Sequence, residues 1–190
     1  MGARVGALTS AAYALPLELH STKLVPNTML VTRAQPADRD AIAETADLSG
    51  VQLDVASELN REWSRLWIVR DEPGDRRVGA FLLAWHVADE VHVIDLATRP
   101  DRRRRGFARV LVRQLLSYAS EAQAQLVLLE VRRSNHAALC LYRDAGFAAV
   151  SVRRDYYSGP VEDAIEMQLA FDPQTGEPTR QPDEIALSDS

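Results

Sequence analysis

A run of arginines, Arg102–Arg105, is followed directly by Gly106 and then, two residues later, by the small Ala108. Guanidinium groups bind phosphate and carboxylate oxygens, so such a run can be a nuclear address, a nucleic-acid patch, a solvated surface or a small-anion site. The run stands out because the formal net charge of the 190-residue chain is -5. Its chemistry therefore depends on the elements on either side of it.

The arginine run lies where a predicted strand gives way to a predicted helix. Residues 91–98 form a strand-like stretch, and apolar residues recur at helical spacing between 107 and 118. A helix N-terminus offers unpaired backbone N–H groups and a partial positive charge, and neither Gly106 nor Ala108 has a side chain that blocks an anion. This setting favours a phosphate site, with a solvated loop as the alternative. A nucleic-acid groove would need a wider basic stripe, so we predict no nucleic-acid partner.

The central part of the chain alternates between strand and helix patterns. The predicted strands cover residues 29–32, 65–70, 78–86, 91–98, 126–132, 147–157 and 163–171, and the predicted helices cover 35–47, 53–63, a stretch from about 106, and 136–145. Three successive strands with short turns predict an antiparallel meander, and the later strand, helix, strand passage predicts a crossover. We expect one α/β (α+β) domain over residues 29–171, with a mixed, mostly antiparallel central sheet flanked by helices.

The two ends of the chain differ from this domain in composition. Residues 1–28 contain only a short, interrupted apolar stretch, so we predict a flexible N-terminal extension rather than a cleaved signal. Residues 172–190 hold three prolines and five acidic residues against one arginine, which predicts a disordered acidic tail. No apolar run approaches the roughly 20 residues of a membrane span. With a single cysteine, Cys140, and no metal-ligand spacing, we predict a cytoplasmic protein without membrane association, disulfide or metal.

Three motifs in order give the chain its likeness to a known family. Arg103, Gly106 and Ala108 fit the pattern Q/R-x-x-G-x-G/A, residues 129–147 read LEVRRSNHAALCLYRDAGF, and residues 153–169 read RRDYYSGPVEDAIEMQL. Together they resemble the RimI-type ribosomal-protein-alanine N-acetyltransferases of the GNAT superfamily. The resemblance implies a GNAT-like fold and acetyl-CoA as cosubstrate. It also implies transfer of the acetyl group to the N-terminal α-amine of a protein, a ribosomal protein being the implied acceptor.

The resemblance assigns individual residues to this reaction. Glu130, which shares a strand face with Leu126 and Leu128, matches the general base, and Tyr142 matches the general acid that protonates the leaving thiolate. The residues matched to acetyl-CoA, by strand backbone, phosphate loop and helix cap, are Leu96, Ala97, Thr98, Arg103, Arg104, Arg105, Gly106, Phe107, Ala108, Arg109 and Asn135. The plainer interpretations are an edge glutamate at 130, a core tyrosine at 142 and a simple cap at Asn135.

The residues expected to bind the acceptor match the family less well than the residues expected to bind acetyl-CoA. Tyr156 and Tyr157 would help to hold a peptide end, but residues 46–63 stand where the family usually has a Pro-Trp element. Two alternatives therefore stay open: a GNAT acetyltransferase for a small-molecule amine or lysine, and a non-catalytic acetyl-CoA-binding module. We expect Cys140 to be a buried thiol, and His92 and His136 to be structural.

Overall fold

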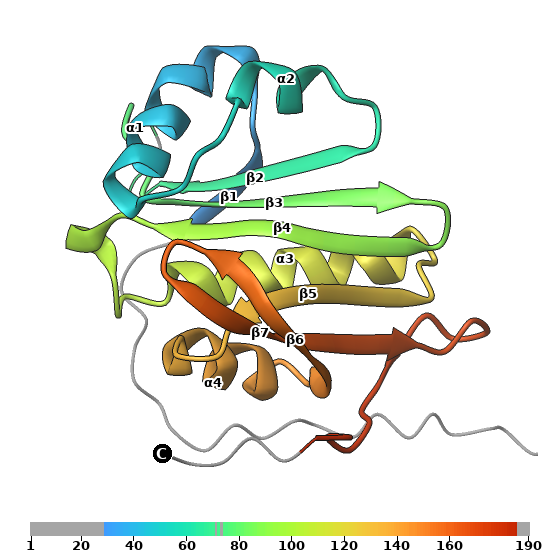
Figure 1. The fold of residues 1–190 in the computed structure, drawn as a ribbon. Helices are drawn as coiled ribbons and strands as arrows, with labels where there is room; N and C mark the ends of the chain where they lie inside the picture. The colour runs from blue at the N-terminus through green and yellow to red at the C-terminus, as the bar shows by residue number, and fades with distance from the viewer. Residues whose placement is uncertain (1–28, 71, 73, 186–190) are drawn as a thin grey trace, which may run out of the picture.

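The fold is built on a central β-sheet with helices packed against it (Figure 1). The structure, a computed structural model, describes residues 29–70, 72 and 74–185, so the predicted extension at 1–28 lies outside the described residues. The strands are β1 (Leu30–Arg33), β2 (Ser64–Arg70), β3 (Ala80–Val87), β4 (Glu90–Thr98), β5 (Leu126–Arg132), β6 (Ala148–Ser158), β7 (Val161–Phe171) and β8 (Pro178–Thr179). Their order is β1-β2-β3-β4-β5-β7-β6, with β8 paired to β7. Of the described pairings only β4 with β5 is parallel, which confirms the mixed, mostly antiparallel sheet.

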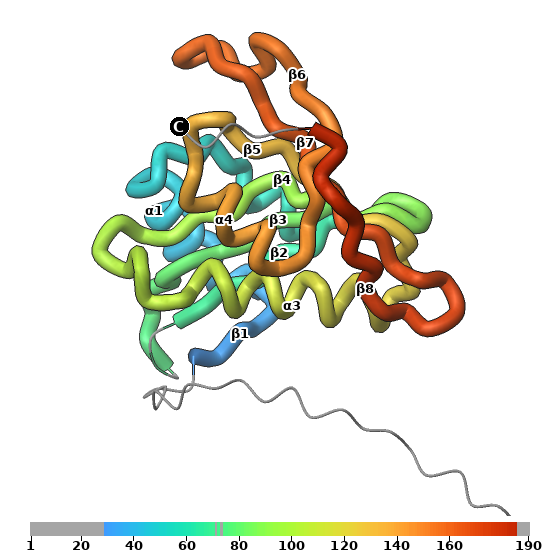
Figure 2. Tube along the Cα trace, turned by 90° about the horizontal axis from the view of Figure 1, so that it is seen from below, coloured from blue at the N-terminus to red at the C-terminus, as the bar shows by residue number. Residues whose placement is uncertain are grey.

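Helices cover both faces of this sheet. They are α1 (Arg39–Ser49), α2 (Val55–Asn60), α3 (Phe107–Glu121) and α4 (His136–Asp144), with 3-10 turns η1 (Pro36–Asp38) and η2 (Pro100–Arg102). Ile42 of α1 and Val55 of α2 pack in one core with Leu83, whereas Leu111 of α3 and Leu139 of α4 pack in the core on the other face. Figure 1 shows α1 and α2 above β1–β4, and Figure 2, viewed from below, shows α3 and α4 in front of the sheet.

The first two helices of the domain differ most from their predicted bounds. The predicted helix at 35–47 begins as η1 and continues as α1, and the one at 53–63 is only the short α2. Gly50, with a φ of 74°, ends α1 in the left-handed conformation that glycine adopts readily. The connection that follows brings α2 back over the sheet, so α2 and the end of α1 lie on the same face.

The sheet opens between β4 and β5. Their parallel pairing runs from Glu90 opposite Leu126 to Val93 opposite Leu129, and none is described beyond it, although β4 stays paired with β3 as far as Thr98. A β-bulge opposite the Leu83–Ala84 step inserts one extra residue into β4 at this point. Past Val93 the edge of β4 that faces β5 therefore has no strand partner among the described residues, and the two strands border an opening.

The segment after β7 differs from its prediction. Within residues 172–185, β8 pairs with Ala170 and Phe171 of β7, and Glu184 donates its backbone N–H to the carbonyl of Ala149 at 2.8 Å. The Asp183 carboxylate accepts a hydrogen bond from the Ala149 N–H at 2.8 Å and ion-pairs with Arg143. Composition predicted a disordered acidic tail, but these contacts hold residues 172–185 against the domain, and residues 186–190 lie outside the described part.

Candidate active site

Helix α3 begins with unused backbone donors. Gly106 is its N-cap, with a φ of 89° that a residue with a side chain rarely adopts. Among the described residues, the N–H groups of residues 106–109 have no hydrogen-bond acceptor, and the first helical bond runs from Val110 N to Gly106 O at 3.1 Å. These four donors and the positive end of the α3 dipole point out of the helix together, which is the arrangement that binds phosphate groups.

A close approach between α3 and the sheet fixes the position of these donors. A Cβ atom added to Gly79 would lie 2.6 Å from the Phe107 ring, so only glycine leaves room for this packing. Phe107 is 1% exposed and part of the core, which means that only its backbone can face a ligand. Sequence reasoning missed the role of Gly79, because a glycine at the start of a strand pattern does not identify the side chain that will cover it.

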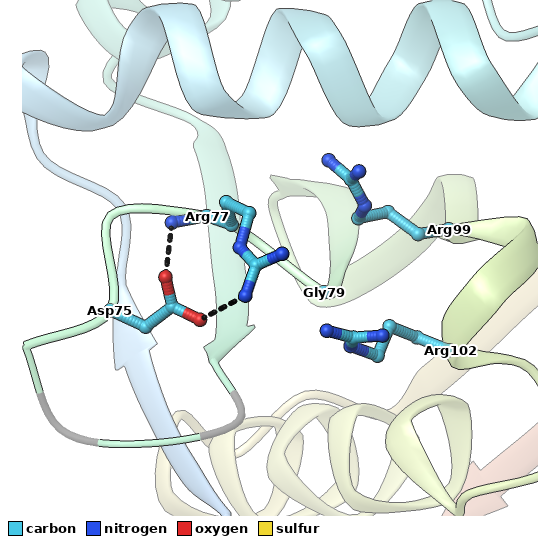
Figure 3. Close-up of a pocket in the computed structure, with 5 residues that line it drawn as sticks. All are labelled: Asp75, Arg77, Gly79, Arg99 and Arg102. Atoms are coloured by element: carbon cyan, nitrogen blue, oxygen red, sulfur yellow. Dashed lines mark hydrogen bonds and ion pairs between the residues drawn. The ribbon is translucent and has the colours of Figure 1, made fainter.

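The arginine run divides into two groups. Figure 3 shows Arg77, Arg99 and Arg102 around a narrow pocket. Arg99 ion-pairs with Glu44, and Arg102 ion-pairs with Asp101, each at 2.9 Å. Carboxylates of the protein thus hold Arg99 and Arg102, which leaves residues 103–105 as the arginines of the run next to the helix start.

Residues 103–105 instead form the loop that leads into α3. Arg104 has a φ of 62°, and this left-handed residue turns the chain toward Gly106. The Arg103 Nε lies 3.5 Å from the carbonyl oxygen of Thr98, and the Arg105 guanidinium lies 5.8 Å from the centre of the Phe107 ring. The side chains of residues 103–105 are exposed, so their positive charge adds to that of the α3 N-terminus.

A groove of about 400 Å³ separates α3 from α4. Val112 and Leu141 contribute apolar lining, and Arg109 and Asp144 join across it in an ion pair of 3.1 Å. Both charged side chains are exposed, so this pair is worth little in water and can open to admit a ligand. At the start of α4, Asn135 accepts a hydrogen bond from the Ala138 N–H at 3.2 Å, which makes it the N-cap of that helix.

The predicted backbone contacts lie at the opening between β4 and β5. Leu96, Ala97 and Thr98 occupy the part of β4 that has left β5, while their other edge pairs with β3. Ala97 is buried, so only its backbone is available to a ligand. An extended chain with amide groups could bond to this edge as a further strand would.

Tyr142 of α4 is almost completely buried, at 5% exposure, and packs edge-to-face on Phe147 with ring centres 5.5 Å apart. Burial is the main cause that raises the pKa of Tyr142 above its usual range, and electrostatic interactions with the Asp95 carboxylate and the Tyr157 phenol add to it. The phenol therefore keeps its proton at neutral pH, but giving it up costs more than for a free tyrosine.

Glu130 lies on the face of β5 that is turned away from α3 and α4, because Leu129 and Val131 on either side of it are buried in the core of those helices. It stands opposite Glu166 of β7, and Arg153 bridges the two carboxylates with contacts of 3.1 Å each. Its side chain is 22% exposed. Glu130 is thus neither a free edge glutamate nor an isolated base.

The tyrosine pair of β6 sits beside Glu130. The register of β6 shifts between Arg153 and Tyr157, so several residues of β6 bulge away from β7. The Tyr157 hydroxyl donates to the backbone carbonyl of Glu130 at 3.3 Å, and the Arg132 guanidinium stacks 4.0 Å from the centre of its ring. Tyr156 is about half exposed, and its ring lies edge-on to that of Tyr157. The bulge therefore presents an aromatic surface at the rim of the opening.

Asp95 is a residue that the motif comparison did not select. It is half-buried on β4, just past the last pairing with β5, and burial followed by the charge of Glu58 raises its pKa to about 6. The available signal was an acidic residue in the middle of the apolar stretch VHVIDLAT. The face of β4 on which Asp95 lies depends on the bulge, which the sequence pattern does not reveal.

Two further observations limit the chemistry of the described residues. The expectation of a buried Cys140 is wrong: its side chain is exposed, because α4 turns Leu139 and Tyr142 toward the core instead. Within residues 29–70, 72 and 74–185, no group of three or more His, Cys, Asp or Glu side chains could hold a metal ion. In the same part of the chain, no helix is long and apolar enough to cross a membrane.

Comparison with known proteins identifies the family of this fold. Residues 37–147 match the model of the Acetyltransferase (GNAT) family. The chain belongs to the GNAT acetyltransferase family. A ribosomal protein bS18-alanine N-acetyltransferase of Salmonella typhimurium is 39% identical to this GNAT protein over 97 residues, which are 50% of this chain and 66% of the relative. The match thus spans slightly less than two thirds of that relative's length.

Solved structures share the fold over more of the chain. The crystal structure of the ribosomal-protein-S18-alanine N-acetyltransferase from Escherichia coli superposes with a TM-score of 0.68 at 25% identity, over 84% of this GNAT protein and 99% of that chain. A Bacillus subtilis acetyltransferase in complex with CoA gives a TM-score of 0.65 at 15% identity, over 76% and 100%. These superpositions confirm the predicted GNAT fold.

Proposed function

We propose that this GNAT protein transfers the acetyl group of acetyl-CoA to the N-terminal α-amine of a protein, with a ribosomal protein that begins with alanine as the acceptor. The observation that carries the proposal is the set of four unused N–H donors at residues 106–109, next to the opening between β4 and β5. The similarity to enzymes named for bS18-alanine acetylation supports the choice of acceptor.

The residues around the opening fit the parts of acetyl-CoA. The pyrophosphate would accept hydrogen bonds from the N–H groups of residues 106–109, with Arg103, Arg104 and Arg105 beside it. The amide groups of the pantetheine arm would bond to the free edge of β4 along residues 96–98. The groove between α3 and α4 would take more of the cofactor, with Arg109 released from Asp144. Asn135, the N-cap of α4, would be a further contact.

Tyr142 and Glu130 would supply the proton transfers. Acetyl transfer needs a neutral amine, a polarised thioester carbonyl and a proton for the leaving thiolate. We assign the last of these to Tyr142, whose raised pKa keeps it protonated until the thiolate forms. Glu130 would accept a proton from the attacking nitrogen through a water molecule, with Arg153 holding its carboxylate in place.

The α-amine is the acceptor that this site can use with least assistance. A peptide α-amine has a pKa of about 7.7 to 8.0, and a lysine amine about 10.4, so at neutral pH far more of the α-amine is neutral. The exposed Tyr156 beside the opening would contact the peptide. A small amine or lysine acceptor stays the second candidate, because residues 46–63, which form the end of α1 and the short α2, depart in sequence from the family's usual Pro-Trp element.

A panel of amines tests the proposal. The purified protein would be incubated with acetyl-CoA and an N-terminal alanine peptide, a lysine peptide blocked at its N-terminus, or a polyamine, and the released thiol would be measured. We expect thiol release with the alanine peptide at the highest kcat/KM. Release with only the polyamine or the lysine peptide would refute the acceptor, and no release with any amine, despite bound acetyl-CoA, would favour the non-catalytic binding module.

A further inference from the structure

We propose that Asp183 is a positioning residue for Tyr142: it holds the C-terminal end of α4 and so fixes where the Tyr142 hydroxyl lies during acetyl transfer. The inference rests on the proposed transferase function, in which Tyr142 protonates the leaving thiolate. It gives a role to residues 172–185, the C-terminal strap, which lie beyond the three sequence motifs and beyond the family match at residues 37–147.

The Tyr142 hydroxyl depends on the position of its helix. The ring packs edge-to-face on Phe147, and the hydroxyl makes no hydrogen bond with any of the described residues. A proton donor must lie within hydrogen-bond distance of the atom that it protonates, and a shift of about 1 Å can cost about 10²-fold in rate. A movement of α4 would therefore move the phenol with it, because no described side chain holds the hydroxyl in place.

Helix α4 is a short element that borders an open groove. It is nine residues long, and its buried side chains are Leu139 and Tyr142. On one side the groove of about 400 Å³ separates α4 from α3, and the ion pair of Arg109 with Asp144 across this groove is exposed. Since an exposed ion pair contributes little, the C-terminal end of α4 needs a further attachment to stay in one position.

The strap supplies this attachment through Asp183. One carboxylate oxygen of Asp183 accepts a hydrogen bond from the Ala149 N–H at 2.8 Å, and the other forms an ion pair with Arg143 in the last turn of α4. The Nε of Arg143 is buried and has no hydrogen-bond partner among the described residues. Asp183 therefore offsets the cost of burying part of this guanidinium, and without Asp183 the Arg143 side chain would be more stable in water.

The contacts of Asp183 enclose the turn that follows α4. Asp183 binds Arg143 before this turn and Ala149 after it. Between them, the Phe147 N–H donates a hydrogen bond to the Tyr142 carbonyl at 3.0 Å, and the Phe147 ring contacts the Tyr142 ring. One carboxylate thus fixes both ends of the segment that places the phenol and the ring packed against it.

The other end of the strap provides a matched control. Asp172 accepts hydrogen bonds from the N–H groups of Gln174 and Thr175 at 2.8 and 2.9 Å, and the Ser120 hydroxyl of α3 donates to the Gly176 carbonyl at 2.6 Å. Figure 2 shows the strap, in red, running beside β7. Asp172→Asn removes the same charge from the same segment as Asp183→Asn, but it leaves the contact with α4 in place.

Hydrogen exchange tests the attachment without any substrate. The N–H groups of residues 145–147 bond to carbonyls in the last turns of α4, and Asp183→Asn should speed their exchange by about fivefold. Exchange in α3 should not change, and Asp172→Asn should exchange like the wild type at residues 145–147. Equal exchange at these residues in Asp183→Asn and the wild type would overturn the proposal, whether or not the protein proves to be a transferase.

A double-mutant cycle tests the link to Tyr142. At saturating acetyl-CoA, Asp183→Asn should lower kcat by about tenfold in the wild-type background, because the phenol is displaced, but by less than about twofold in Tyr142→Phe, which has no proton to place. Asp172→Asn should change kcat by less than about twofold in both backgrounds. Equal losses from Asp183→Asn in the two backgrounds would overturn the positioning role, whereas a wild type that acetylates no amine would refute the proposed function itself.

Discussion

The polar groups of the two strands that border the opening differ in whether they have partners within the protein. On the β5 side, Glu130 is paired with Arg153, and the Tyr157 hydroxyl bonds to the Glu130 carbonyl. On the β4 side, the Asp95 carboxylate has no hydrogen-bond or ion-pair partner among the described residues, and residues 94–98 have no described pairing toward β5. Preorganised groups suit a chemical step, and unpaired groups suit a ligand that satisfies them. The difference predicts that changes near β5 alter turnover and that changes near β4 alter binding.

The largest expected effect tests the chemical side. Tyr142→Phe removes the proposed proton donor and keeps the ring that packs on Phe147, so kcat should fall by about 10²- to 10³-fold. The affinity for acetyl-CoA should stay within about twofold. Rapid-quench kinetics and calorimetric titration would measure the two quantities.

A second tyrosine provides the control for this change. Tyr118 of α3 accepts a hydrogen bond from Arg65 at 2.7 Å and contacts His86, in a cluster that contains no residue assigned to the reaction. Tyr118→Phe should lower stability and leave kcat nearly unchanged. Equal losses of kcat in both variants would contradict a special role for Tyr142.

The next effect separates Glu130 from the cation that holds it. Glu130→Gln should lower kcat by about 10- to 100-fold, because the proposed base is lost while the shape is kept. Arg153→Gln leaves the base in place and breaks a half-exposed ion pair, so kcat should change by less than about fivefold. If both variants lose the same activity, Glu130 acts through its pairing with Arg153 rather than as a base.

A smaller effect is expected at the cofactor loop, and it should appear in KM. Arg103→Gln combined with Arg105→Gln should raise the KM for acetyl-CoA by about five- to tenfold and leave the KM for peptide unchanged. The effect should weaken at high salt, because the loop is exposed. The exposed Arg76 offers a matched control, and a similar KM change in Arg76→Gln would show that overall charge, not the loop, is responsible.

The smallest effect concerns stability on the β4 side. The folded-state pKa of Asp95, about 6, lies above the ordinary aspartate value of 3.8, so the ionised carboxylate destabilises the folded protein at pH values above 6. Asp95→Asn should therefore raise the free energy of unfolding by about 1–2 kcal/mol at pH 8, after allowance for solvent screening. The gain should shrink as the pH falls from 6 toward 4.

Urea unfolding at pH 8 and at pH 4 would measure this difference. Asp47→Asn, at an exposed position of α1, controls for the loss of one negative charge. A stabilisation by Asp95→Asn that is the same at both pH values, or is shared by Asp47→Asn, would show that burial of the Asp95 carboxylate is not its cause.

Local patterns explain why the cofactor side could be predicted from the sequence. The glycine at 106, the small residue at 108 and the helical spacing that follows are all properties of one short segment. They predicted the start of α3 and its unused donors, and the structure has Gly106 as the N-cap with free N–H groups behind it. The order of strands and helices followed from the same kind of local periodicity.

Contacts between distant segments explain what the sequence did not reveal. The direction of Asp95 depends on a bulge that forms only when β4 pairs with β3. Residues 172–185 have a polar composition typical of a disordered tail, yet Asp183 binds Arg143 and the backbone of Ala149. The exposure of Cys140 likewise depends on which face of α4 meets the sheet. None of these contacts can be predicted from the spacing of the residues involved.

The most direct test of the proposed activity is the position of the acetyl group on a peptide product. The wild-type protein would be incubated with acetyl-CoA and an alanine-initiated peptide that also contains one lysine, and the product would be sequenced by tandem mass spectrometry. The account predicts one acetyl group on the α-nitrogen and one released thiol per peptide. An acetyl group on the lysine alone, or no transfer while acetyl-CoA is bound, would contradict it.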